Sequence, residues 1–171
     1  GSVLLIFADN DKAKKNLTKE IILRGIQPNR IIFGKRLSKS EYLARYQVAN
    51  LFLDTQPYNA GTTASDALRM GLPVLTLKGN SFNSREAASI ISALNLPELI
   101  TANQEEYESL AIELATHPEK LKIIKDKLVS NLSTAPLYNT KLFTKNLESA
   151  YTMMYDRYHQ GLDPDHIYVK H

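Results

Sequence analysis

The chain has 171 residues, of which 43% are hydrophobic, and this length and composition are those of one domain with one core. No apolar run approaches the roughly 20 residues that span a bilayer, and no signal peptide is recognised, so we expect a soluble cytoplasmic protein. The absence of cysteine excludes disulfides and thiol catalysis. The net charge of +3 falls short of the clustered basic surface of a nucleic-acid-binding protein. The four histidines (His117, His159, His166 and His171) are too scattered for a metal site.

The first quarter of the chain predicts alternating strands and helices. The expected elements are a buried strand at 3–8, a helix at 12–24, a strand at 30–34 and a helix from 38 to about 49. Leu17, Ile21 and Ile22 recur at helical spacing and should face inward, and Gly25 should end their helix. Residues 38–41 read Ser-Lys-Ser-Glu, a capping box that opens the second helix.

The same alternation continues to the end of the chain. The expected elements are a buried strand at 51–54, a helix from 61 that ends at Gly71, a strand at 73–77, a helix at 85–94, a short strand at 98–100 and helices at 104–115, 118–131 and 140–159. Strands that alternate with helices predict an α/β fold, with a Rossmann-like parallel sheet and helices on both faces.

Apolar residues recur at helical spacing along the last predicted helix. They are Leu142, Phe143, Leu147, Tyr151, Met154, Tyr155 and Tyr158. We expect this stripe to pack into the core, and the alternative is that part of it faces another domain. Residues 1–161 are predicted to form the domain, and residues 162–171 an extended C-terminal tail.

One stretch, residues 51–68, predicts a ligand site. It reads LFLDTQPYNAGTTASDAL, which is a strand, a polar loop and a helix start. Ligands of open parallel sheets bind at the carboxyl ends of strands, where helix N-termini offer free N–H groups to phosphate. Gly61 permits close approach, Thr62 and Thr63 can donate hydrogen bonds, and Asp66 could accept from sugar hydroxyls. The alternative is an ordinary helix with Thr62 as N-cap and Asp66 in its acidic first turn.

A basic cluster follows the second predicted strand, at the same carboxyl edge of the expected sheet. It comprises Lys35, Arg36, Lys39 and Arg45. Lys39, Tyr42 and Arg45 stand at i, i+3 and i+6 and can share one side of a helix. Solvated surface charge is the simple alternative.

A family resemblance extends over nearly the whole chain. The donor-binding segment of the O-linked N-acetylglucosamine transferase family, with its bacterial and SPINDLY-like members, resembles residues 52–89, which read FLDTQPYNAGTTASDALRMGLPVLTLKGNSFNSREAAS. Further similar blocks are 98–100, Tyr107, 135–141 and 163–166. These blocks occur in the family's order and at similar spacing.

The resemblance implies the donor-binding lobe of a GT-B glycosyltransferase. Such enzymes have two Rossmann-like lobes, invert the sugar's configuration and need no metal or other cofactor. The implied reaction transfers a sugar, most simply N-acetylglucosamine from UDP-GlcNAc, to Ser or Thr hydroxyls of proteins. SPINDLY-like plant relatives use GDP-fucose, so the base and sugar stay open.

The resemblance also implies parts of the family's enzymes that we do not expect in residues 1–171. They are the first strand and helix of the lobe with a lysine beside the diphosphate, an N-terminal lobe, and helical repeats that bind acceptor proteins. We therefore expect a fragment that is inactive alone, and catalytic residues cannot be assigned in it.

The resemblance also implies roles for individual residues in the basic cluster. Positions that match Lys39, Tyr42 and Arg45 lie beside the nucleotide's base and diphosphate in the family. Vertebrate members have histidine where this chain has Tyr42, whose ring could still stack on the base.

At the predicted phosphate site, Thr62, Thr63 and Asp66 match the family's pattern. Gly61 replaces a histidine, so it departs from that pattern. For Arg85, which also recurs in the family, we expect a structural role.

Two other classes of function remain as alternatives. A Rossmann-like oxidoreductase is disfavoured, because no Gly-x-Gly-x-x-Gly follows the first strand. A non-catalytic interaction domain could keep the fold without the ligand, because a fold does not fix a function. Failure to bind any nucleotide would favour the interaction domain.

Overall fold

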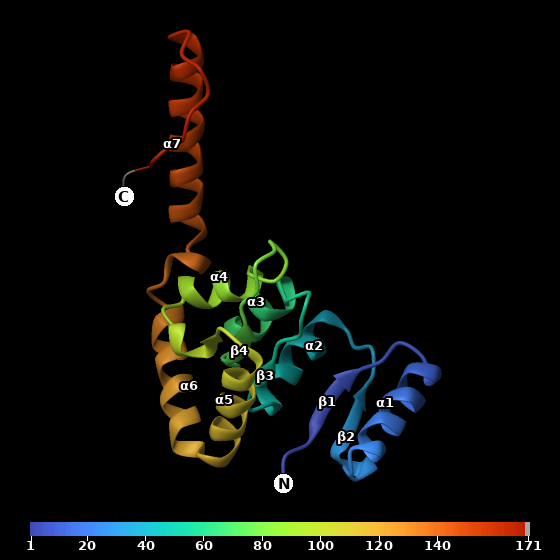
Figure 1. Cartoon of the computed structure of the whole chain (residues 1–171). Coiled ribbons are helices and arrows are strands. Elements are labelled where there is room, and N and C mark those ends of the chain that lie inside the picture. The colour runs from blue at the N-terminus through green and yellow to red at the C-terminus, as the bar shows by residue number, and fades with distance from the viewer. Residues whose placement is uncertain (170–171) are drawn as a thin grey trace. The chain divides into compact units, whose positions relative to one another are not determined.

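The computed structural model describes residues 1–169, and it contains two compact units, Gly1–Val48 and Ala49–His171 (Figure 1). Lys170 and His171, the last two residues of the predicted tail, lie outside the described residues. Within residues 1–169 every strand pairs in parallel, as predicted. These strands form one two-stranded and one three-stranded sheet. The parallel α/β fold class is therefore confirmed.

The first unit contains the two-stranded sheet. Its elements are β1 (Leu4–Phe7), α1 (Asp11–Leu23), η1 (Pro28–Arg30), β2 (Ile31–Gly34), α2 (Lys39–Arg45) and η2 (Tyr46–Val48). β1 pairs with β2 from Leu4 opposite Ile31 to Phe7 opposite Gly34. Gly25 ends the α1 turn at a φ of +73°, in the left-handed region that favours glycine. Ser38 and Glu41 form the predicted capping box, and these hydrogen bonds lower the pKa of Glu41.

Burial in the first unit is lower than the sequence predicts. The β1 side chains of Leu4 and Phe7 are exposed, as is Ile22 of α1 at 51%. The predictions that residues 3–8 form a buried strand and that Ile22 faces inward are therefore wrong for this unit. A parallel sheet normally has both faces covered, and a unit with two short strands has too few elements to do so.

The second unit is built on the three-stranded sheet. Its elements are β3 (Phe52–Leu53), α3 (Thr62–Arg69), β4 (Val74–Leu77), α4 (Glu86–Ala93), η3 (Pro97–Leu99), β5 (Ile100–Thr101), α5 (Gln104–Thr116), α6 (Pro118–Leu132), η4 (Pro136–Tyr138) and α7 (Thr140–His159). The strand order is β3-β4-β5, so β4 is central, and Val74, Leu75 and Thr76 are fully buried.

Two strand predictions need correction in the second unit. Leu53 is 43% exposed, because β3 lies at an edge of its sheet, whereas the sequence predicted a buried strand. The short strand predicted at 98–100 begins two residues later. Pro97 opens the 3-10 turn η3, and β5 follows at Ile100–Thr101. Proline fixes φ and cannot donate to the ladder, which favours the turn over the strand there.

Helix α7 has the predicted bounds but no buried residue. Phe143, Tyr151, Tyr155 and Tyr158 are each at least 60% exposed. The prediction that this stripe packs into the core is therefore wrong: the spacing indicated an amphipathic helix correctly but could not show what covers it. The alternative, that part of the stripe faces another domain, stays a prediction. Residues 162–169, after α7, form no helix or strand, and Arg157 donates from Nε to the carbonyl of Asp163.

Candidate functional site

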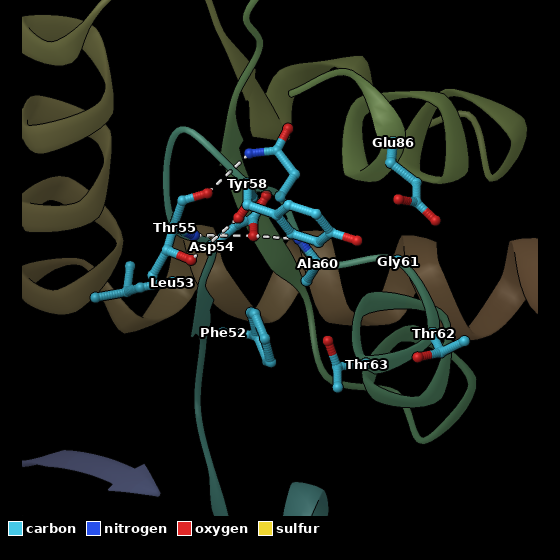
Figure 2. Close-up of a pocket in the computed structure, with 11 residues that line it drawn as sticks. Phe52, Leu53, Asp54, Thr55, Tyr58, Ala60, Gly61, Thr62, Thr63 and Glu86 are labelled. Carbon is cyan, nitrogen blue, oxygen red and sulfur yellow. Dashed lines mark hydrogen bonds between the residues drawn. The ribbon is translucent and has the colours of Figure 1, made fainter. Parts of the chain in front are cut away.

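A pocket of about 450 Å³ lies at the carboxyl end of β3 and the start of α3 (Figure 2). Its lining residues are Phe52, Leu53, Asp54, Thr55, Tyr58, Asn59, Ala60, Gly61, Thr62, Thr63 and Glu86. Three of the predicted site residues, Gly61, Thr62 and Thr63, are among them. Asp66 does not line this pocket but lies further along α3, where it is half-buried.

The start of α3 has no side-chain cap. Gly61 is the N-cap residue and Thr62 is the first helical residue, so the alternative with Thr62 as N-cap is wrong. The first intrahelical bond is donated by Ser65 to Gly61, and the N–H groups before it face no helical carbonyl. The first turn contains no acid, so Asp66 is not a first-turn acid either. The N-terminal turn of the helix and its dipole suit an anion.

The opposite side of α3 fixes its position in the core. Ala64, Ala67 and Leu68 are completely buried. Tyr138 of η4 donates from its hydroxyl to the carbonyl of Ser65 at 2.8 Å, and its ring lies 5.7 Å from the guanidinium carbon of Arg69. These contacts fix α3 within the second unit, so its N-terminus has a fixed position at the pocket.

Asp54 organises the loop between β3 and α3. Its Oδ1 accepts from the N–H groups of Thr55 and Ala60, both at 2.8 Å (Figure 2). Its Oδ2 accepts from the hydroxyl of Thr76 at 2.6 Å. Burial raises the pKa of this carboxyl, and the three hydrogen bonds partly oppose that rise. Asp54 therefore joins both ends of the loop to the central strand β4.

Three further hydrogen bonds hold the same loop, one within it and two to other parts of the second unit. Asn59 donates from its backbone N–H to the carbonyl of Asn83 at 3.1 Å, and from Nδ2 to the carbonyl of Thr55 at 2.9 Å. Tyr107 of α5 donates to the carbonyl of Asp54 at 2.8 Å, and burial together with the Asp54 charge raises the pKa of Tyr107 to about 12. Hydrogen bonds to Asn83 and to α5 therefore hold the loop that lines the pocket.

The sequence prediction missed Glu86, the first residue of α4. Its carboxylate lies against Gly61, and a Cβ added to Gly61 would stand 2.6 Å from the carboxyl carbon. No local pattern links residues 25 positions apart, so only the fold shows this contact. Arg85, immediately before it, donates from Nε to the carbonyl of Ser81 at 3.2 Å, which is a local structural contact of the kind predicted.

The predicted basic cluster lies in the first unit and contains a cation–aromatic arrangement. The ring of Tyr42 has Lys39 Nζ at 5.0 Å and the guanidinium carbon of Arg45 at 5.6 Å. Arg45 also donates to the carbonyl of Lys35 at 3.2 Å. The other member, Arg36, pairs with a neighbouring acid, Asp9, at 2.9 Å. Within this unit the structure therefore brings Lys39, Tyr42 and Arg45 together.

Comparison with known proteins decides the family. The sequence profile of Glycosyl transferase family 41 matches residues 1–147. The chain belongs to glycosyl transferase family 41. No helix within residues 1–169 is both long and apolar enough to cross a membrane, and those residues contain no group of three or more candidate metal ligands.

Relatives in family 41 include named enzymes and a solved structure. A UDP-N-acetylglucosamine–peptide N-acetylglucosaminyltransferase from Caenorhabditis elegans is 32% identical over 97% of this chain and 14% of its own length. The probable enzyme SEC from Arabidopsis thaliana is 36% identical over 85% of the chain and 15% of its own length. A mutant O-GlcNAc transferase from Thermobaculum terrenum has a TM-score of 0.82 at 30% identity, over 89% of this chain and 30% of that one. The chain thus spans about one seventh of the curated relatives.

Proposed function

We propose that this family 41 chain binds the nucleotide-sugar donor of a protein O-glycosyltransferase. The full-length enzyme transfers a sugar, most simply N-acetylglucosamine from UDP-GlcNAc, to Ser or Thr hydroxyls. The relatives named as peptide N-acetylglucosaminyltransferases support this reaction class. We assign acceptor binding to the N-terminal lobe and repeats of the full-length enzyme, and we assign no catalytic residue among the described residues.

The observation that carries the proposal is the uncapped, glycine-led start of α3 in the pocket. The backbone N–H groups at the start of α3, together with the positive end of the helix dipole, suit the diphosphate of such a donor. As the bond from sugar to diphosphate breaks, negative charge develops on the leaving group. Preorganised N–H donors stabilise that charge without a metal ion.

The proposal extends to the first unit. Lys39 and Arg45 supply positive charge beside the ring of Tyr42, and an aromatic ring can stack on a nucleobase while cations neutralise phosphate. We therefore assign Lys39, Tyr42 and Arg45 to nucleotide binding, on the basis of this arrangement and of the family resemblance.

A ligand panel tests the proposed function. UDP, GDP, UDP-GlcNAc and GDP-fucose are added to the full-length protein, and the shift in unfolding temperature is measured. A bound donor at 100 times its dissociation constant stabilises the fold by about 2.7 kcal/mol. We expect stabilisation by one nucleotide and its sugar. Absence of any stabilisation would favour the non-catalytic interaction domain.

Asp66→Asn is expected to weaken nucleotide binding without weakening pyrophosphate binding. If the carboxylate accepts from the ribose hydroxyls, asparagine replaces one charged acceptor oxygen by a donor, and charge-assisted hydrogen bonds are about twice as strong as neutral ones. We expect a loss of about 1 kcal/mol for UDP and UDP-GlcNAc alike, measured by calorimetry. The matched control is Asp126→Asn on the exposed side of α6. An equal loss for pyrophosphate would contradict a ribose contact.

A further inference from the structure

The Glu86 carboxylate occupies the space beside Gly61 that any larger residue at position 61 would need. A Cβ on Gly61 would lie 2.6 Å from the carboxyl carbon and 3.0 Å from Oε2 of Glu86. Real Cβ atoms are not found this close to neighbouring atoms. The Glu86 carboxylate can therefore occupy this position only because residue 61 is glycine. The side chain of Glu86 comes from α4 towards Gly61 and lines the same pocket as Thr62 and Thr63 (Figure 2).

Helix packing explains why Glu86 reaches this place. Helices α3 and α4 contact each other, and each buries small side chains, Ala64 and Ala67 on α3 and Ala87 and Ala88 on α4. Small residues let two helices approach closely. Glu86 is the first residue of α4, so this approach delivers its carboxylate to the start of α3.

The Glu86 carboxylate can accept a hydrogen bond from a ligand in this pocket. An ionised carboxylate only accepts hydrogen bonds, and the diphosphate expected at Thr62 and Thr63 also only accepts. The two anions therefore repel each other across the pocket. In a nucleotide sugar, the diphosphate joins the ribose, which we assign to Asp66, to the hexose. The hexose offers hydroxyl donors, and an N-acetylated hexose offers an amide N–H as well.

We propose that Glu86 selects the sugar of the donor. Its carboxylate accepts a hydrogen bond from the hexose and disfavours ligands that bring extra negative charge instead, such as the bare nucleotide diphosphate or a nucleotide-linked uronic acid. Glu86 thereby makes the site prefer a neutral nucleotide sugar. This inference rests on the proposed function and adds to it the class of sugar and a residue that recognises it.

A purely structural role makes a different prediction. As an acid in the first turn of α4, Glu86 would stabilise that helix through its dipole. Its replacement would then lower the unfolding temperature and change the affinity for every ligand by the same factor. If Glu86 selects the sugar, its replacement instead changes the ratio of the dissociation constants of different ligands.

The test measures dissociation constants of the full-length protein for UDP, UDP-GlcNAc and UDP-glucuronic acid, with GDP, GDP-fucose and GDP-mannuronic acid in parallel. The wild type should bind the neutral nucleotide sugar more tightly than the other two ligands of its set. Glu86→Ala should reduce the preference for the neutral sugar over the bare diphosphate by about tenfold or more, which is the range for a hydrogen bond to a charged group. Glu86→Gln should improve binding of the uronic acid most, because it removes one of two facing charges.

Two variants sharpen the result. Glu105→Gln removes a first-turn acid from α5, outside the pocket, and should leave all ratios unchanged. Gly61→Ala should displace the flexible end of Glu86 and reproduce the loss of sugar preference, but should add little in the Glu86→Ala background. Such coupling is the mark of two residues that act through one contact.

Equal changes for all ligands in Glu86→Ala and Glu86→Gln would overturn the role of Glu86 while leaving the proposed function intact. A wild-type protein that binds none of the six ligands would contradict the proposed function itself, and this inference with it. The two failures are therefore distinguishable by whether the wild type binds.

Discussion

Replacement of both Thr62 and Thr63 by alanine in the full-length protein is expected to weaken donor binding by about 1–3 kcal/mol, the range for hydrogen bonds to charged groups. Both hydroxyls lie at the start of α3 and line the pocket. Alanine keeps the backbone N–H groups and the helix dipole, so the change isolates what the hydroxyls add. Calorimetric titration with UDP and with UDP-GlcNAc measures the loss.

The matched control for this pair is the double serine variant. Serine retains a hydroxyl at each position and should bind the donor within a few tenths of a kcal/mol of the wild type, well inside the loss expected for alanine. Both variants should unfold near the wild-type temperature, since Thr62 and Thr63 are exposed. Unchanged donor affinity in the double alanine variant would show that the Thr62 and Thr63 side chains do not bind the donor.

Asp54→Ala is expected to destabilise the fold by about 1–3 kcal/mol or more, because it leaves buried donors without an acceptor. The carboxylate accepts from Thr55, Ala60 and Thr76, and Asp54 is only 6% exposed. The loop that leads to α3 would lose its attachment to β4. Asp54→Asn keeps an oxygen for the two N–H groups and should cost less. Chemical denaturation at neutral pH compares the two variants.

The raised pKa of Asp54 is tested by measuring the stability of the wild type and of Asp54→Asn as a function of pH. Burial raises the pKa of Asp54 in the folded state, so folding favours the protonated carboxyl. The stability from this group is complete below the ordinary aspartate pKa of about 4, and is lost as pH rises from there through the raised folded pKa. The wild type should therefore lose stability relative to Asp54→Asn across that window. If the wild type instead gained stability relative to Asp54→Asn as pH rose, the pKa of Asp54 would be lowered in the folded state.

The features that sequence predicted well are set by local chemistry. The end of α1 follows from Gly25 in the left-handed region, and the start of α2 from the capping box of Ser38 and Glu41. The bounds of α7 follow from its apolar spacing. The strand, loop and glycine-led helix at 51–68 were also recognisable, because each signal lies within a few residues.

The features that sequence did not predict depend on distant neighbours. The contact of Asp54 with Thr76 spans 22 residues, and that of Gly61 with Glu86 spans 25. Neither spacing has a periodic signal. Burial was overestimated for the same reason: the apolar runs of β1 and α7 indicate faces that need a partner, but spacing alone does not say whether this chain supplies it.

The most direct test is a crystal structure of the full-length protein with UDP bound. We predict that the diphosphate accepts hydrogen bonds from the N–H groups of Thr62 and Thr63 at the start of α3, with the ribose within hydrogen-bonding distance of the Asp66 carboxylate. A diphosphate bound elsewhere, with the start of α3 left to solvent, would contradict the central claim that this helix start is the donor's phosphate site.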